Sequence, residues 1–380
     1  MAELAAKPND FRPRRVPLGL RLLVLCLALL VCLSATAWLA CGLGPAPIGG
    51  HGGPGEVGKL YFQPVAAGRI IATRLGALLS PQGVSGLRGD ERIVLQMRLP
   101  RVILAACVGA LLAVAGCAFQ GLLRNPLADP YIIGVSSGAA LGASIAFAFG
   151  LDRLAGGYGV TPLAFAGAVG TMLVVYGLAY KAGRVAVESF LLAGVVVGSF
   201  MWASVFIVMA LAALTQEGHR AYFQDIALWL MGDLAQARWQ AVGSILPLSL
   251  LGCALIYAFS RDLNLMLLGE EPAVHLGVRI ETVKKVIIAA AALVTAAAVS
   301  AVGVIGFLGF IVPHIMRRLV GPDHRILLPT AALAGGLFLI CADTLARSLL
   351  PPNELPAGVV TALVGAPFFC HLLWKRRRQA

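Results

Sequence analysis

The chain has 380 residues, of which 59% are hydrophobic and 13% charged, with a formal net charge of +12. Its mean hydropathy of +0.86 lies above that of soluble domains, so the composition excludes an ordinary soluble protein and indicates a membrane protein. The basic residues are spread over many segments without interleaved aromatic residues, which excludes nucleic acid as a partner.

Runs without acidic or basic side chains predict the membrane-spanning helices, because about 20 apolar residues cross a bilayer as a helix. Nine runs are present, near residues 22–42, 102–123, 131–151, 160–180, 189–214, 239–260, 286–316, 326–342 and 355–374. The run at 286–316 is too long for one span, and glycines at 303, 306 and 309 predict two short helices joined by a tight turn. The predicted fold class is therefore an all-α polytopic membrane protein with ten transmembrane helices over residues 22–374.

Residues 1–21 are predicted to form a cytoplasmic N-terminal segment. The first helix is expected to stay uncleaved, because its apolar run exceeds the roughly 7 to 15 residues of a signal peptide. A long outer loop is predicted over 43–97. Within it, GPGEVGKL at 53–60 is similar to a phosphate-binding loop, but Leu60 stands where such a loop has Ser or Thr. The chain is therefore expected to lack a nucleotide site, and any ATPase would be a separate chain.

The distribution of basic residues predicts the orientation, because lysine and arginine favour the cytoplasmic side of a membrane protein. With a cytoplasmic N-terminus, 19 of the 30 lysines and arginines fall on the inner side and 11 on the outer side. Both termini are therefore predicted to be cytoplasmic, together with a loop at 261–285 and a basic tail at 375–380.

Side chains for catalysis or metal binding follow no recognisable pattern. The eight cysteines and six histidines are dispersed, so we expect no metal site and interpret the cysteines as small buried hydrophobes. An intramembrane enzyme is the weakest class, which leaves transport.

A polar kink, RNPLADP at 124–130, separates the second and third predicted helices. Pro126 and Pro130 force a bend, and non-helical backbone at membrane depth occurs where protein or a water-filled cavity satisfies it. Gly134, Gly138 and Gly142 then form a small-residue stripe on one helix face. The stripe is typical of close helix packing, which does not exclude a helix that lines a path.

Five segments together resemble one family. They are RLPRVILAACVGALLAVAGCAFQGLLRNPLADPYIIGVSSGAALG at 98–142, LGEEPAVHLGV at 268–278, GFLGFIVPHIMRRLVGPDHRILLP at 306–329, ADTLAR at 342–347 and ELPAGVVTALVGAPFF at 354–369. These segments resemble the FecCD-type permeases, the membrane subunits of ABC importers for ferric siderophores, haem and cobalamin. The resemblance implies a type II ABC importer permease fold in the bacterial inner membrane, working as a homodimer. It also implies two ATPase subunits inside, which hold ATP and Mg²⁺, and a substrate-binding protein outside. No cofactor is expected on this chain.

The segment 267–277 contains E-P-A-x-x-x-G, which is similar to the E-A-A-x-x-x-G coupling loop of ABC importers. The resemblance implies that a short helix here seats in a cleft of the ATPase, with leucines as buried anchors and glutamates as charged contacts. The implied coupling residues are Leu267, Leu268, Gly269, Glu270, Glu271, Ala273, Leu276 and Gly277. The alternative is an ordinary solvated helix at the membrane surface.

Three arginines match family residues that dock the binding protein: Arg98, Arg101 and Arg347. Guanidinium groups pair well with carboxylates and would steer such a partner. For Arg347 an internal ion pair is the alternative, because Asp343 lies four residues earlier on the same helix face.

The resemblance also implies a gate at the cytoplasmic narrowing of the path, formed by Asn125 and Leu127 and, at the start of the fifth helix, by Val187 and Glu188. Relatives carry small hydroxyl residues at the latter two positions, and Glu188 could instead cap its helix, where a carboxylate meets the dipole favourably. The fifth helix, with Gly194 and Gly198, and the tenth are expected to form the dimer contact and the pathway wall.

The expected function is ATP-driven alternating access for an iron chelate, with a ferric siderophore as the commonest cargo class of the family. Haem or cobalamin would use the same machine. An ion-coupled secondary transporter is the remaining alternative, and the absence of charge in the middle of the predicted spans argues against it.

Overall fold

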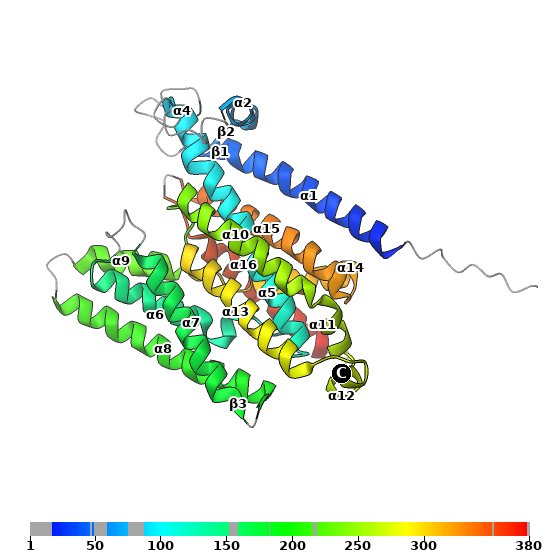
Figure 1. Ribbon diagram of the computed structural model, residues 1–380. Coiled ribbons are helices and arrows are strands. Elements are labelled where there is room, and N and C mark those ends of the chain that lie inside the picture. Colours follow the sequence, from blue (N-terminus) through cyan, green and yellow to red (C-terminus); the bar gives the residue numbers. More distant parts are fainter. Residues whose placement is uncertain are drawn as a thin grey trace, which may run out of the picture.

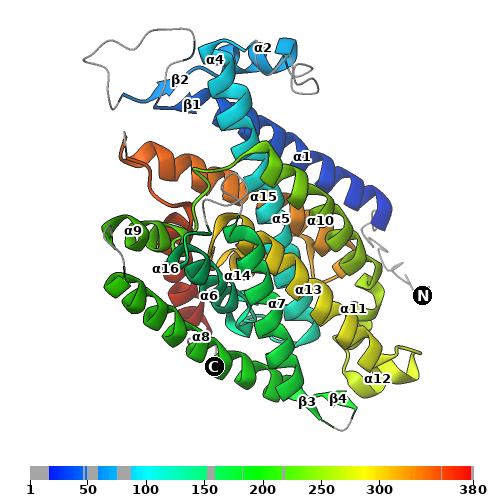
Figure 2. The ribbon, with the colours of Figure 1, turned by 60° about the vertical axis from the view of Figure 1, so that its left-hand side comes forward.

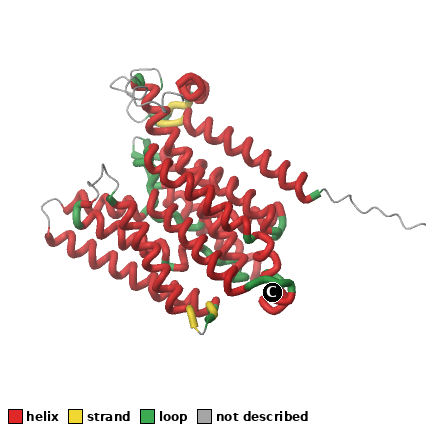
Figure 3. The backbone as a smooth tube through the Cα atoms, in the orientation of Figure 1, coloured by secondary structure: helices red, strands yellow, loops and turns green. Residues whose placement is uncertain are grey.

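The structure is a computed structural model that describes residues 17–45, 48, 59–74, 87–151, 159–181, 183–215, 219–351 and 353–377. Three predicted segments lie wholly or partly outside these ranges. They are most of the N-terminal segment 1–21, most of the motif at 53–60 that is similar to a phosphate-binding loop, and the last three residues of the tail 375–380. Within them the chain is almost entirely helical, with two short hairpins (Figure 3).

The first half of the chain contains α1 (Leu18–Gly42), α2 (Pro64–Arg74), α4 (Gly89–Arg92), η2 (Ile93–Arg98), α5 (Leu99–Leu122), η3 (Pro130–Ile133), α6 (Val135–Ala148) and α7 (Val160–Ala179). The second half contains α8 (Val187–Thr215), α9 (His219–Leu230), α10 (Trp239–Ala258), α11 (Ser260–Met266), α12 (Glu270–His275), α13 (Ile280–Val302), α14 (Leu308–Val320), α15 (His324–Leu349) and α16 (Ala357–Arg377). The strands pair antiparallel as β1 (Leu43–Gly44) with β2 (Tyr61–Phe62) and β3 (Tyr180–Lys181) with β4 (Arg184–Val185).

The predicted fold class and helix count are confirmed. Eight helices of the described chain are long and apolar enough to span a bilayer, and the shorter α6 and α14 bring the number to ten. The break in the run 286–316 occurs at 303–307, where Gly303 has a φ of 78° that favours glycine. However, α13 is a full span of 23 residues, because it begins at Ile280 and includes charged residues that had ended the apolar run.

The predicted outer loop is shorter and more structured than 43–97. Helix α4, η2 and α5 form one continuous rod from Gly89, since the charged residues at 90–92 and Arg98 interrupt the apolar run without interrupting the helix. The remainder contains the β1–β2 hairpin and α2. Helix α9 was not predicted, because its 12 residues mix apolar side chains with His219, Arg220 and Asp225.

Helix α5 lies at the centre of the bundle, among α10, α13, α14 and α15 (Figures 1 and 2). Its closest neighbour is α15, where Gly109 and Gly335 face each other. A Cβ atom on either glycine would overlap the backbone carbonyl of the other, so this contact requires glycine on both helices.

The glycine stripe of α6 is a packing surface. Gly138 and Gly142 lie against Thr171 and Leu163 of α7, so closely that a Cβ atom would overlap either neighbour. Gly134, with a φ of 90°, faces the backbone of α8 at Gly194. The packing interpretation of the stripe is therefore correct.

The interpretation of all cysteines as buried is wrong for three of them. Cys41, Cys107 and Cys117 are buried, but Cys32, Cys341 and Cys370 are exposed on helix surfaces. Apolar faces of spanning helices turn outward because lipid tails, and not water, surround them, so a burial rule from soluble proteins does not hold there.

Candidate functional site

The predicted coupling segment lies at one end of the bundle, beside the β3–β4 hairpin, and the β1–β2 hairpin, α2 and α4 lie at the opposite end (Figure 1). It consists of α11 and α12, joined by a turn at Gly269, whose φ of 120° favours glycine. A second turn follows α12, where Gly277 has a φ of 86° and the N–H of Val278 donates to the carbonyl oxygen of Ala273 at 3.0 Å. Both predicted glycines therefore shape the segment.

Apolar side chains of this segment are uncovered although it lies outside the spanning helices. Leu267 is 42% exposed, Leu268 65% and Leu276 56%, and Val274 of α12 is also exposed at 56%. Ala273 is buried and anchors α12 to the bundle. Since water would surround these groups in an isolated subunit, the arrangement is typical of a surface that a partner covers.

A cavity of about 520 Å³ opens on the bundle where three connections meet α14 and α16. Leu127, Asp129 and Tyr131 come from the α5–α6 connection, and Leu230 and Met231 from the end of α9. Val304, Gly306, Phe307, Phe310, Gly358, Val359, Ala362 and Phe369 complete the lining from the α13–α14 connection, α14 and α16. The lining is apolar apart from Asp129 and the hydroxyl of Tyr131, so the cavity suits a large and mostly apolar occupant.

Aromatic rings cluster on one side of this cavity. The ring of Phe310 lies 5.2 Å from that of Phe369 and 6.4 Å from that of Phe368, both at steep angles, and His314 stacks on Phe310 at 6.2 Å. Such edge-to-face contacts stabilise the wall between α14 and α16.

Polar side chains hold the kink at 124–130 in place. Asn125 Oδ1 accepts from the N–H of Leu127 at 2.9 Å, and Asp129 Oδ1 accepts from the N–H of Tyr131 at 2.9 Å. The buried Gln120 amide donates to the carbonyl oxygen of Ala128 at 3.3 Å. The kink is thus polar because its non-helical backbone needs these side chains as partners.

Asp129 is the carboxylate of the cavity. Burial among apolar neighbours raises its pKa to about 6, and the hydrogen bond from the Tyr131 N–H partly opposes that shift. This group therefore titrates close to neutral pH.

The predicted gate residues do not come together within one subunit. Leu127 lines the cavity and Asn125 supports it. Val187 and Glu188 lie instead in the first turn of α8, and Glu188 is exposed there, where its carboxylate favours the helix N-terminus. Gly194 and Gly198 face inward against Gly134, and the exposed face of α8 consists of large apolar side chains.

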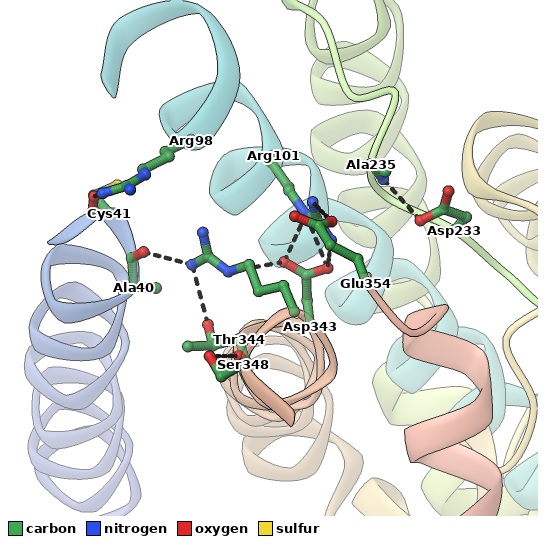
Figure 4. A network of polar contacts seen from close by, with 11 residues as sticks. Ala40, Cys41, Arg98, Arg101, Asp233, Ala235, Asp343, Thr344, Ser348 and Glu354 are labelled. Carbon is green, nitrogen blue, oxygen red and sulfur yellow. Dashed lines mark hydrogen bonds and ion pairs between the residues drawn. The ribbon is translucent and has the colours of Figure 1, made fainter. Parts of the chain in front are cut away.

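The three predicted docking arginines are buried inside the subunit. Figure 4 shows Arg98 beside Cys41, and Arg101 beside Asp343 and Glu354. Arg98 donates to the carbonyl oxygen of Cys41 at 3.1 Å, and Arg347 donates to that of Ala40. These carbonyls lie in the last turn of α1, where the N–H of Leu43 also donates to Ala40, so two guanidinium groups add to the capping of the helix. The internal contact of Arg347 with Asp343 is long, at 3.9 Å.

Arg101 is the main partner of Asp343. Its Nε and Nη2 lie 2.9 Å and 2.8 Å from the two carboxylate oxygens, and its Nη1 lies 2.6 Å from Glu354, just before α16. A bidentate pair of this kind fixes α5, α15 and the start of α16 relative to one another. Glu354 was not predicted as a site residue, because no sequence spacing links it to Arg101.

A profile of the FecCD transport family matches residues 69–375. The chain belongs to the FecCD transport family. It is 46% identical to the cobalamin import permease BtuC of Halobacterium salinarum over 76% of this chain and 75% of the relative. It is 42% identical to the hemin permease HmuU of Yersinia pestis over 76% and 84% of the two chains. A solved structure described as an inward-facing ABC transporter of metal-chelate type superposes with a TM-score of 0.72 at 30% identity, over 93% of this chain and 99% of that chain.

The described residues contain no cluster of three histidine, cysteine, aspartate or glutamate side chains that could hold a metal ion. The FecCD relatives named above are transport permeases, and the uncovered segment around α12 and the apolar cavity are the features of this chain that suit such a role.

Proposed function

We propose that this chain is the permease subunit of a binding-protein-dependent ABC importer, in which two copies form the path. The observation that carries the proposal is the uncovered apolar surface around α12, where Leu267 and Leu268 before the helix, Val274 within it and Leu276 after it are exposed. An ATPase subunit would cover this surface, and its nucleotide-driven closure would move α12. ATP and Mg²⁺ would bind to the ATPase chain and not to this one.

We place α12, the β3–β4 hairpin and both termini on the cytoplasmic side of the inner membrane, on the strength of the excess of lysine and arginine there. The β1–β2 hairpin and α2 then face a substrate-binding protein. Arg98, Arg101 and Arg347 lie at that end, but each would meet a carboxylate of the binding protein only after leaving an internal partner.

We propose that the cargo is a metal chelate with a largely apolar surface. A corrinoid or haem is favoured over a ferric siderophore, because relatives named for cobalamin and hemin are 46% and 42% identical, whereas two named for ferric hydroxamate are 36% and 39% identical. The aromatic wall of the cavity supports the same choice, since aromatic rings pack well against flat macrocycles.

Uptake of labelled cyanocobalamin, haemin and ferrichrome tests both parts of the proposal. Cells that lack this chain should lose uptake of one cargo, and the parent chain should restore it. Leu268→Asp should abolish restoration and release the ATPase from the purified complex, because a carboxylate would replace a buried anchor. Leu319→Asp is the matched control, since Leu319 is 68% exposed but lies in α14.

Three outcomes would contradict parts of this proposal. Uptake that persists without the chain, in cells with no second system, would overturn the importer function. Uptake that stops with an ionophore but not on ATP depletion would favour the ion-coupled transporter. Uptake of ferrichrome alone would return the cargo to the siderophore class.

A further inference from the structure

Lys284 is a buried lysine at the end of the bundle that contains α12. It lies in the second turn of α13, and only 4% of the residue is exposed. Its Nζ lies 3.0 Å from a carboxylate oxygen of Glu270 in α12 and 3.3 Å from Glu281 Oε1 one turn earlier. It also donates to the carbonyl oxygen of Val185 in β4 at 3.4 Å. The three donors of the ammonium group thus have three partners on three elements.

The backbone N–H and carbonyl oxygen of Val185 both form hydrogen bonds with charged side chains, those of Glu281 and Lys284. Its N–H donates to Glu281 Oε2 at 3.2 Å, while its carbonyl oxygen accepts from Lys284. The side chain of Val185 is itself buried, so the β4 strand is fixed against α13. Helix α8 begins two residues later, at Val187. The position of the N-terminus of α8 therefore depends on Lys284 and Glu281.

The first half of α8 also contacts the segment that leads to the cavity. Gly194 and Gly198 of α8 pack against Gly134, directly after η3, so closely that a Cβ atom on Gly134 would lie 3.3 Å from the carbonyl oxygen of Gly194. The α5–α6 connection that precedes Gly134 supplies Leu127 and Asp129 to the cavity wall. A displacement of α8 along its axis would therefore shift one wall of the cavity.

We propose that Lys284 is a positioning residue that couples α12 to α8, so that movement of the coupling segment is transmitted through the β3–β4 hairpin to the cavity. This inference rests on the proposed function, because an ATPase must move α12. The linkage is direct, since one buried ammonium group contacts both α12 and the strand that leads into α8. Removing the ammonium would leave Glu270 and Glu281 close together without their shared cation, and α12 would lose its ionic link to the hairpin.

The test measures cargo molecules transported per ATP hydrolysed, in liposomes that contain the complete complex with its ATPase and binding protein. The cargo is whichever of cyanocobalamin, haemin or ferrichrome the parent complex transports. Lys284→Met should lower this ratio by about tenfold, within the range usual for coupling between sites. Lys284→Arg should restore part of the loss, because a guanidinium can still pair with both carboxylates. Lys181→Met is the matched control, since Lys181 lies in the same hairpin but is exposed.

Hydrogen exchange separates coupling from a merely structural role. In the parent complex, trapping the ATPase with ATP and vanadate should change amide exchange both at 267–278 and at 180–190. In Lys284→Met the change should remain at 267–278 and disappear at 180–190. If the Lys284→Met complex fails to assemble, the same measurements on Glu281→Gln test the inference. This variant weakens the contact between residue 281 and the Val185 N–H, while the ion pair between Lys284 and Glu270 remains.

An unchanged transport ratio in an assembled Lys284→Met complex would overturn the inference, and so would exchange that still changes at 180–190. Failure of the proposed function would look different, because the parent complex itself would then show no ATP-dependent transport.

Discussion

Arg101 of α5 donates two parallel hydrogen bonds to the carboxylate of Asp343 of α15, and both side chains are almost fully buried. The remaining Nη1 of Arg101 reaches Glu354 before α16. One guanidinium group therefore joins α5 to two segments that are distant in sequence, since Asp343 and Glu354 lie 242 and 253 residues after Arg101. Such a pair is costly to desolvate, and it is tolerated here because each oxygen of Asp343 has a donor.

Asp343→Asn should destabilise the protein strongly. Removing one partner of a buried ion pair leaves the other charge uncompensated, which costs about 3–5 kcal/mol. The double variant Arg101→Leu, Asp343→Leu should recover part of that loss, because the bidentate pair is then removed as a whole. The recovery is incomplete because Arg347 and Glu354 each lose an oppositely charged neighbour. Unfolding of the purified protein in detergent measures both. Arg74→Gln is the control, since Arg74 pairs with Glu91 but is 51% exposed, and we expect a change within about 1 kcal/mol. Equal losses for Asp343→Asn and Arg74→Gln would contradict the role of burial.

Glu354→Gln tests whether the outer arginines dock the binding protein. Neutralising Glu354, whose side chain is 28% exposed, frees one nitrogen of Arg101 without touching the Asp343 pair. If binding-protein carboxylates compete for Arg101, the affinity for the binding protein should rise in Glu354→Gln. It should fall in Arg101→Gln by at least about tenfold, as expected when a charge pair loses one partner. Titration of labelled binding protein onto the reconstituted complex measures both constants. If neither variant changes the affinity for the binding protein, Arg101 serves the internal structure of the subunit alone.

Asp129 should make stability depend on pH. Its pKa is raised from the ordinary value of 3.8 to about 6 by burial, so the folded state prefers the neutral acid. The stability that the neutral Asp129 contributes to the folded state is fully present below pH 4, and it is lost as the pH rises through about 6. Asp129→Asn removes the dependence and keeps an acceptor for the Tyr131 N–H. Its stability relative to the parent should therefore increase by about 1–3 kcal/mol between pH 4 and pH 7. A difference that stays constant over this range would show that Asp129 does not titrate there.

Gly109→Ala should loosen the bundle at its centre. The added methyl group would overlap the carbonyl of Gly335, and overpacking of this kind costs about 1–3 kcal/mol. Gly177→Ala in α7 is the matched control, because no atom lies within 4 Å of the position that its Cβ would take. The control should be neutral or slightly more stable, since alanine favours the helix over glycine. Thermal unfolding of both variants measures the contrast, and equal effects would mean that α5 and α15 can separate without cost.

The sequence alone determined the class of the protein and the number of its spanning helices. Length and apolarity suffice for eight spans, because a bilayer demands about 20 apolar residues per helix. The shorter α6 and α14 were counted because a proline kink and a glycine break divide the apolar runs. The glycines at 303–309 located the break between α13 and α14 for the same local reason, since φ at Gly303 is positive. The resemblance to a coupling loop singled out residues 267–277, and the structure gives this segment two glycine turns and exposed leucines. Its contact with an ATPase stays a prediction.

The tertiary structure decided which polar residues meet. No local pattern brings Arg101 to Glu354 or Lys284 to Val185, because these contacts depend on how α5, α13 and α15 pack. Packing also sets Gly194 and Gly198 against Gly134, a contact that no local pattern predicts. Their place at the dimer contact and pathway wall, which the resemblance implied, stays a prediction. The hydrophobic pattern specifies that a helix spans the membrane but not which neighbour each face meets, since lipid and protein interior are equally apolar. Close contacts at glycines and the pairing of buried charges determine which helices pack against each other.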